Sequence, residues 1–295
     1  MPRFNHGFLL FNGQAGQDSS EIALSKVVPI LATHCSQLTI VQTMSPEEFQ
    51  DAILQTESAD VLFLLGGDGT LHTAIQVLET MKNVPAIGIL PGGTCNDFAR
   101  TLGIPLTLEL AVESLVNGNV APMDLAQIND RWFMNFAGVG LIADASENIN
   151  PDLKSKYGKL SYFMSAIQSF KQSEPIPFQI HIDGVSYLEE AVMVLVMNGN
   201  SIGTHRFPLE IIDPSDGMLD IIVVQSSTMV AIREWYSLNQ PHIVPDDLNN
   251  ITHYRGKQIS IKTSEPKKVD TDGEIYLETP LQIQVHSKKI NFLIP

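Results

Sequence analysis

The first part of the chain alternates short apolar runs with longer amphipathic segments. We expect buried strands where leucine and β-branched residues run together, at 7–11, 38–42, 60–65 and 86–90. We expect helices where apolar residues recur every three or four positions, at 19–33, 46–57, 70–81 and 96–102. Ser45 marks one helix start, because it precedes a proline and two glutamates. This alternation predicts a parallel α/β sheet with helices on both faces.

After Asn117 the pattern changes to strand-like segments joined by short polar turns. These segments lie at 120–128, 131–139, 178–183, 189–197, 219–224, 258–263 and 281–286. Helical spacing interrupts them near 157–171 and 228–239. We therefore expect an α/β domain at residues 1–126 and a mainly antiparallel, β-rich domain at residues 127–295, whose last strand can pack back on the first domain.

Composition narrows the classes of function. The chain has 295 residues and a formal charge of −15, which argues against nucleic acid as a partner. Cys35 and Cys95 match no metal-binding spacing and suit a reducing compartment, and the eight histidines form no cluster typical of zinc or iron sites. The longest apolar run, 191–197, is far shorter than the roughly 20 residues of a membrane-spanning helix. We expect a cytoplasmic protein without a membrane anchor.

A glycine-rich turn follows the third predicted strand. The sequence GGDGT, residues 66–70, leads directly from that strand into a helix. Glycines allow backbone N–H groups to approach a phosphate closely, and the helix N-terminus adds a partial positive charge. Asp68 stands where a phosphate-bound Mg²⁺ would need an oxygen ligand. The alternative is an ordinary strand-to-helix turn with Asp68 as a cap.

A second glycine-rich turn follows the next strand and again leads into a helix. It contains Gly92 and Gly93, with Asn96 or Asp97 in position to cap the helix. Successive loops after parallel strands lie at the same carboxyl edge of the sheet, where such sheets bind ligands. The two loops therefore predict one phosphate-binding site.

These motifs resemble the diacylglycerol kinase catalytic-domain family, in its bacterial soluble lipid kinase branch. The segments that carry the resemblance are GGDGT at 66–70, LPGGTCNDFARTLGIP at 90–105, DLAQINDRWFMNFAGVG at 124–140, YGKLSYF at 157–163, DPSDGMLDI at 213–221 and DGE at 272–274. They cover nearly the whole chain. The first motif is shared with NAD kinases, whereas the second motif, the β-rich half and the final DGE are more specific to lipid kinases.

The resemblance implies an NAD kinase-like nucleotide-binding domain, a lipid-substrate domain, and ATP and Mg²⁺ as cofactors. It implies phosphate or ribose contacts from Gly66, Gly67, Gly69, Thr70, Gly92, Gly93, Thr94 and Asn96. It places Asp68 and Asp97 in a carboxylate network around Mg²⁺. For Asp97, a role as a helix cap alone is the alternative.

The segment 213–218 is a candidate metal loop. Asp213 and Asp216 flank a proline turn, so both carboxylates can point at one ion, with the Met218 backbone carbonyl as a further oxygen. Similar lipid kinases hold a structural Mg²⁺ in this loop. The alternative is a β-turn, for which the composition is equally suitable.

The segment 269–274 contains the candidate general base. If it is extended, Asp270, Asp272 and Glu274 share one face. The resemblance makes Glu274 the base toward the lipid hydroxyl, with Asp272 as support. In the alternative, Asp272 and Gly273 form a hairpin turn and Glu274 is solvated.

The predicted helix at 157–171 has an apolar stripe and lysines nearby, so it fits either the core or a membrane surface. The chain also departs from the family near Gln17, where a Gly-Lys is usual, at His72, where an Asn-Glu pair is usual, and near Thr204, where a Gly-Gly is usual. These departures leave the acidic residues intact and bear on lipid choice or activity.

We interpret the chain as an ATP-dependent lipid kinase that associates peripherally with membranes and phosphorylates diacylglycerol to phosphatidic acid. An NAD kinase and a non-catalytic regulator that binds nucleotide or lipid are the alternatives. Phosphatidylglycerol, a sphingoid base and an isoprenoid alcohol are further candidate acceptors. The oligomeric state is open, and a homodimer is compatible with the sequence.

Overall fold

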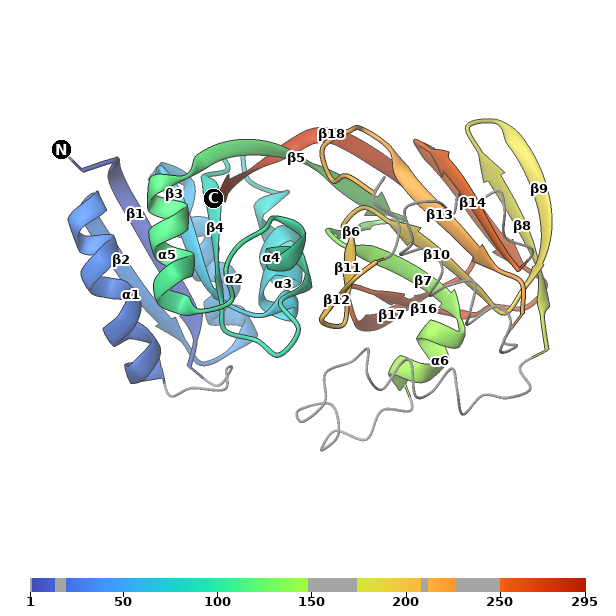
Figure 1. Ribbon diagram of the computed structural model, residues 1–295, viewed down its shortest axis with the longest axis horizontal. Helices are drawn as coiled ribbons and strands as arrows, with labels where there is room; N and C mark the ends of the chain where they lie inside the picture. The colour runs from blue at the N-terminus through green and yellow to red at the C-terminus, as the bar shows by residue number, and fades with distance from the viewer. Residues whose placement is uncertain (1, 14–19, 148–173, 208–211, 227–249) are drawn as a thin grey trace. The chain divides into compact units, whose positions relative to one another are not determined.

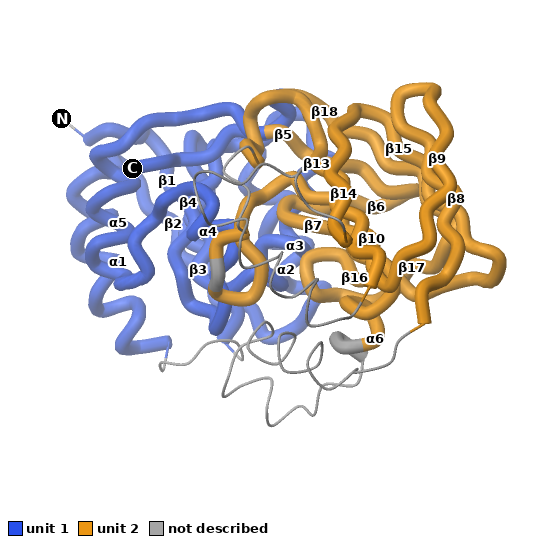
Figure 2. The backbone as a smooth tube through the Cα atoms, turned by 45° about the vertical axis from the view of Figure 1, so that its right-hand side comes forward, with its two compact units in different colours: residues 1–123, 288–295 blue, residues 124–287 orange. Residues whose placement is uncertain are grey.

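The computed structural model describes the chain except for residues 1, 14–19, 148–173, 208–211 and 227–249 (Figure 1). The predicted helices at 157–171 and 228–239 lie outside the described residues. The chain forms two compact units, 1–123 with 288–295 and 124–287 (Figure 2). The strands β5 (Asn119–Ile128) and β18 (Leu281–Ile294) each begin in one unit and end in the other.

The first unit is a parallel α/β sheet, as predicted. Its elements are β1 (Phe4–Asn12), α1 (Ser20–His34), β2 (Cys35–Thr43), α2 (Pro46–Leu54), the 3₁₀ helix Gln55–Ser58, β3 (Val61–Gly66), α3 (Asp68–Leu78), β4 (Ala86–Pro91), α4 (Asp97–Thr101) and α5 (Leu108–Asn117). The strands are ordered β2-β1-β3-β4, and each neighbouring pair is parallel. The end of β18 adds to this sheet, because Phe292 pairs in parallel with Ile87 of β4.

Local chemistry explains the start of α2. The Ser45 side chain accepts a hydrogen bond from the Glu48 N–H at 3.2 Å, and the Glu48 carboxylate accepts one from the Met44 N–H at 2.7 Å. Pro46 stands at the first helical turn, where its missing N–H costs nothing. The predicted helix start is therefore confirmed.

The second unit is a β-sandwich. One sheet contains part of β18, β15 (Gln258–Thr263), β8 (Ile176–Ile182) and β9 (Val185–Ala191), with β5 and β6 (Arg131–Phe133) paired alongside. The other has the order β14 (Ile251–Gly256), β13 (Leu219–Val224), β10 (Met193–Met197), β7 (Phe136–Gly140), β16 (Lys268–Thr271) and β17 (Glu274–Glu278). The remaining elements are α6 (Leu141–Glu147), β11 (Ser201–Ile202) and β12 (His205–Arg206).

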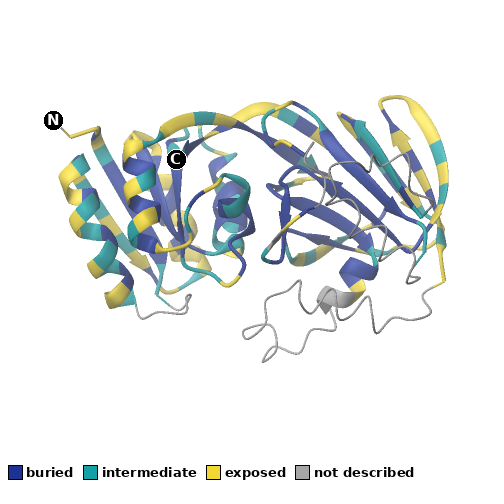
Figure 3. Ribbon diagram, in the orientation of Figure 1, coloured by how far each residue is buried: buried dark blue, intermediate teal, exposed yellow. Residues whose placement is uncertain are grey.

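Two apolar clusters bury the second sheet from both sides. One lies between the two sheets and includes Val194, Val196 and Ile221, and the other lies on the opposite face and includes Leu195 and Ile222. Every residue of β10 and β13 is therefore buried, including the acidic Asp220 (Figure 3). This burial explains why both strands are almost continuously apolar in the sequence.

Candidate functional site

The first glycine loop joins β3 to α3. Gly67 holds the N-cap position of α3 and, having no side chain, contributes no capping bond. A Cβ at Gly66 would lie 2.4 Å from the Thr70 hydroxyl oxygen, so only glycine allows this close approach. Gly69 is exposed in the first turn of the helix, and Asp68 is partly exposed at its first position. The N-terminal N–H groups of an 11-residue helix thus follow directly after the strand.

The second glycine loop packs against the first. The Gly92 N–H donates to the Gly66 carbonyl at 2.9 Å. A Cβ on Gly67 would lie 2.9 Å from the Gly93 Cα, and a Cβ on Gly93 would lie 2.5 Å from the Gly67 Cα. The backbones of Gly67 and Gly93 are therefore in direct contact, which is possible because neither residue has a side chain. The structure brings the two predicted loops together.

Asn96 closes the second loop on itself. Its side-chain oxygen accepts from the Gly93 N–H at 3.0 Å, and its side-chain nitrogen donates to the Gly93 carbonyl at 2.8 Å. Asn96 has a left-handed backbone with φ of 53°, which asparagine tolerates better than most residues. It precedes α4 without a side-chain capping bond, and Thr94 is exposed in the same loop.

Asp68 reaches from the first loop to the start of α4. Its carboxylate accepts a hydrogen bond from the Phe98 N–H at 3.2 Å. Asp97, the first residue of α4, is buried with 7% of its surface exposed. Asp68 and Asp97, which the resemblance places around one Mg²⁺, thus belong to two loops that side-chain and backbone hydrogen bonds join.

A cavity of about 230 Å³ lies at the carboxyl ends of β1, β3 and β4. Its lining includes Asn12, Lys26, Gly66, Gly92, Gly93 and Asn96. The strand order β2-β1-β3-β4 reverses the direction of the crossovers between β1 and β3. Parallel sheets bind ligands outside the carboxyl ends of strands at such a reversal.

In the second unit, the candidate base region is a hairpin and not an extended segment. Asp272 and Gly273 have φ of 51° and 90°, and Thr271 pairs with Glu274 across the turn. Positive φ at both central residues is typical of a two-residue hairpin turn. The segment is therefore not extended, which was the condition for Asp270, Asp272 and Glu274 to share one face, and the alternative of a hairpin turn at Asp272 and Gly273 is found.

The turn buries Asp272 and leaves Glu274 exposed. The Asp272 carboxylate accepts hydrogen bonds from the N–H groups of Met134, Asn135 and Phe136 at 2.8, 2.9 and 3.0 Å. Its own N–H donates to the Phe136 carbonyl at 3.0 Å. Asp272 therefore fixes the turn, and Glu274 extends from a fixed position on the edge strand β17.

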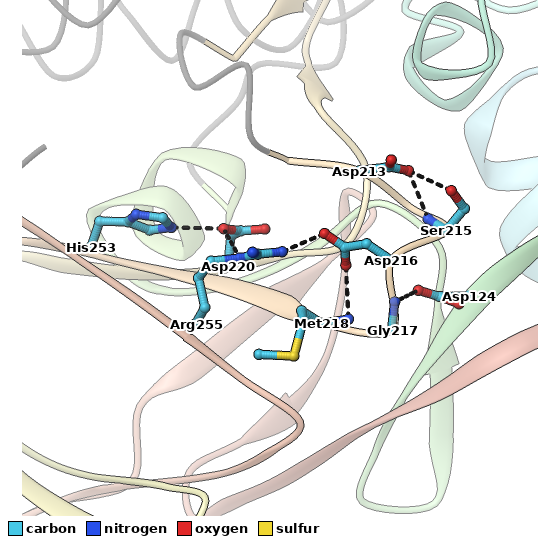
Figure 4. Close-up of polar contacts among 9 residues, drawn as sticks. All are labelled: Asp124, Asp213, Ser215, Asp216, Gly217, Met218, Asp220, His253 and Arg255. Atoms are coloured by element: carbon cyan, nitrogen blue, oxygen red, sulfur yellow. Dashed lines mark hydrogen bonds and ion pairs between the residues drawn. The ribbon is translucent and has the colours of Figure 1, made fainter. Parts of the chain in front are cut away.

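The candidate metal loop is held by its own hydrogen bonds (Figure 4). The Asp213 carboxylate accepts from the Ser215 N–H at 2.9 Å and from the Ser215 hydroxyl at 2.7 Å. The Asp216 carboxylate accepts from the Met218 N–H at 2.9 Å and from the Arg255 guanidinium. Each aspartate thus closes its own turn. Partial burial raises the pKa of Asp216 above its usual value, while the Met218 N–H and Arg255 oppose the rise.

Two buried aspartates beside this loop were not recognised from the sequence as part of its surroundings. The carboxylate of Asp124, fully buried in β5, accepts from the Gly217 N–H at 2.5 Å. Asp220 lies in the apolar run of β13 and binds His253 and Arg255. An acidic residue inside a buried strand pattern is the signal that could have identified both. Among the described residues, no group of three or more His, Cys, Asp and Glu side chains is placed to hold a metal ion.

Two of the three departures can be placed in the structure. His72 is buried in α3 with 6% exposure. Thr204 has φ of 81° in the turn between β11 and β12. Gln17 lies outside the described residues.

Comparison with known proteins agrees with this geometry. Residues 6–128 match the family model described as the diacylglycerol kinase catalytic domain, and residues 136–294 match the YegS C-terminal NAD kinase beta sandwich-like domain. A protein of Staphylococcus aureus strain Newman, named "Putative lipid kinase", is 32% identical over 99% of this chain and 97% of its own length. Two solved structures from Bacillus anthracis, each described as a "putative diacylglycerol kinase", superpose with TM-scores of 0.91 and 0.88. They are 35% and 34% identical, and the matches cover 100% of this chain and 98% and 99% of theirs.

Proposed function

The chain belongs to the family of proteins with a diacylglycerol kinase catalytic domain, and from this membership we propose that it transfers the γ-phosphoryl group of ATP to a lipid hydroxyl. Diacylglycerol is the simplest acceptor, with phosphatidic acid as the product. The names of the related proteins support a lipid acceptor, and the B. anthracis structures are named for diacylglycerol in particular.

The observation that carries the proposal is the contact between the two glycine loops beside the cavity of the first unit. The glycine-rich start of α3 suits the phosphates of ATP, because a helix N-terminus favours negative charge. Mg²⁺ bound with ATP would neutralise charge on the phosphates during transfer. Asp68 and Asp97 are oxygen ligands of the type that Mg²⁺ prefers, and their connected loops fit that role.

Glu274 is the proposed base that accepts the proton of the lipid hydroxyl. Its carboxylate is exposed, and the turn before it is anchored by the three N–H groups that bind Asp272. Phosphoryl transfer needs a base that is positioned rather than strongly shifted in pKa. An exposed side chain on an anchored turn meets this requirement.

Membrane contact is proposed to be peripheral. None of the helices in the described residues combines the length and hydropathy needed to span a bilayer. The lysine-rich segment that could contact anionic lipid, around Lys156 and Lys159, lies outside the described residues. Reversing both charges should lower vesicle binding and lipid turnover together, and unchanged vesicle binding would exclude this contact.

The test is a phosphorylation assay with the full chain, radiolabelled ATP and Mg²⁺. Diacylglycerol, phosphatidylglycerol, a sphingoid base, an isoprenoid alcohol and NAD are offered separately, and the products are identified by mass. We expect phosphatidic acid and ADP in equal amounts, and no product with Asp68→Asn. Phosphorylation of NAD would identify an NAD kinase. ATP binding without transfer to any acceptor would identify a non-catalytic regulator.

A further inference from the structure

Arg255 bridges two carboxylates beside the candidate metal loop. It lies in β14, directly opposite Asp220 of β13 in the antiparallel pair. The Arg255 Nε lies 3.1 Å from Asp220 Oδ1, and the Arg255 Nη2 donates to Asp216 Oδ2. Figure 4 shows the guanidinium extending between the strand and the loop. One side chain therefore supplies positive charge to an aspartate of the sheet and to an aspartate of the loop.

Asp220 also pairs with a second side chain, His253. Asp220 has 2% of its side chain exposed, and its Oδ1 lies 2.7 Å from the His253 Nε2. A buried carboxylate is costly unless it is paired and hydrogen-bonded. Asp220 is thus paired with both His253 and Arg255, and Asp216 of the loop meets the guanidinium that Asp220 also attracts.

The loop backbone is fixed from the other side by Asp124. The Asp124 N–H donates to the Pro214 carbonyl at 2.6 Å, and its carboxylate accepts from the Gly217 N–H at 2.5 Å. These bonds hold the loop at both ends of its central turn. Together with the two turns closed by Asp213 and Asp216, they give the loop hydrogen bonds along its whole length from Asp213 to Met218.

A divalent ion does not fit this arrangement of donors. Mg²⁺ requires oxygen ligands at about 2.0–2.1 Å in octahedral geometry. Among the described residues, no group of three or more His, Cys, Asp and Glu side chains is placed to hold such an ion. The Asp213 carboxylate turns to Ser215, whereas the Asp216 carboxylate turns to Met218 and Arg255. A dication bound to Asp216 would also face the guanidinium, and like charges at short range repel. The loop therefore accommodates one cation on Asp216.

We propose that Arg255 is that cation, and that it takes the place of the structural Mg²⁺ which the resemblance to lipid kinases implies for this loop. The second unit then keeps its fold without divalent metal, and Mg²⁺ serves this protein only as the companion of ATP. The inference concerns the folding of the second unit, so it holds whichever acceptor the enzyme uses.

Thermal unfolding of the full chain without nucleotide or lipid tests this inference. The wild type is measured in EDTA and in Mg²⁺, and Mn²⁺ binding to the protein is followed by electron paramagnetic resonance. We expect the same Tm in both solutions and no stoichiometric Mn²⁺ binding. Arg255→Gln should lose several degrees in EDTA and regain part of the loss in Mg²⁺. Lys262→Gln, which removes an exposed positive charge from β15, is the matched control and should lose almost nothing.

Two results would overturn the inference. The first is a wild-type Tm that rises in Mg²⁺, with one Mn²⁺ bound, where both effects disappear in Asp216→Asn. The second is Arg255→Gln with the same Tm as Lys262→Gln and no response to Mg²⁺. If Arg255→Gln fails to fold, the wild-type comparison alone still decides. Neither measurement depends on turnover, so a failed kinase assay leaves this test intact.

Discussion

Replacing Gly93 with alanine should separate the two glycine loops. The new Cβ would lie 2.5 Å from the Gly67 Cα and 3.1 Å from the Asn96 side-chain oxygen. Carbon atoms in favourable contact are about 3.5–4.0 Å apart, so the loops must move apart by about 1 Å. Gly93 has no positive φ, so the backbone itself tolerates alanine and the whole effect comes from this contact.

The expected losses of stability and of Mg·ATP affinity follow from the close contact of the two backbone segments. Overpacking of this kind costs about 1–3 kcal/mol of folding free energy, or about 2–4 °C of Tm for each kcal/mol. Phosphate binding needs both loops in register, so we expect the Kd for Mg·ATP to rise at least about tenfold, which corresponds to ~1.4 kcal/mol. Calorimetry with a non-hydrolysable ATP analogue measures this change without any lipid.

Gly92→Ala is the matched control. Its new Cβ would lie 3.3 Å from the Gly66 nitrogen, so neighbours need to give way by only a few tenths of an ångström. We expect a clearly smaller loss of both Tm and affinity. If Gly93→Ala binds the analogue as tightly as the wild type, the contact between the loops does not control phosphate binding. If both variants lose the same amount of Tm and affinity, contact distance does not determine the effect.

Three further changes test other parts of the site. Glu274→Gln should lower kcat by about 10²–10⁴-fold and leave the affinity for Mg·ATP unchanged, whereas Asp68→Asn should weaken that affinity. Near wild-type turnover in Glu274→Gln would identify Glu274 as a solvated turn residue. Lys26→Met should raise the KM for ATP more than it lowers kcat, because Lys26 lines the cavity. An unchanged KM would exclude a contact between Lys26 and the phosphates. Partial burial raises the pKa of Tyr276 to about 12, so its contribution to stability is present below pH 10 and is lost as pH rises through about 12. A phenolate absorbance difference between wild type and Tyr276→Phe should appear in that window, and a transition complete by pH 10 would contradict the burial argument.

Local patterns predicted the first unit well, because its elements are set by neighbouring residues. The run at 60–65 is apolar throughout and becomes β3, buried from Val61 to Gly66. Glycines after β3 and β4 then mark the carboxyl edge, which the parallel topology makes a single site. The helix α5 was not predicted, although its apolar positions were visible in the sequence. Its buried residues are Leu108, Ala111, Val112, Leu115 and Val116.

Contacts between distant residues explain what the sequence could not predict. Asp68 binds the Phe98 N–H, which lies 30 residues away, and Asp216 binds Arg255, which lies 39 residues away. No local pattern contains such pairs. At Asp272 two local signals disagreed, since the alternation of acidic residues favoured a strand and Asp-Gly favoured a hairpin turn. The hairpin is found because the buried Asp272 carboxylate gains three backbone hydrogen bonds there.

Buried asparagine also connects two candidate regions of the second unit that are far apart in sequence. The Asn198 side chain donates to the Met134 carbonyl at 2.7 Å and to the Asp124 carbonyl at 3.2 Å, and its N–H donates to the Asn135 carbonyl at 2.8 Å. The segment beginning at Met134 binds the Asp272 carboxylate, while Asp124 holds the Asp213–Met218 loop. Because an unsatisfied buried carbonyl costs about 1–3 kcal/mol, neither attachment can be released without penalty. The geometry of the hairpin before Glu274 and that of the loop paired with Arg255 are therefore set together.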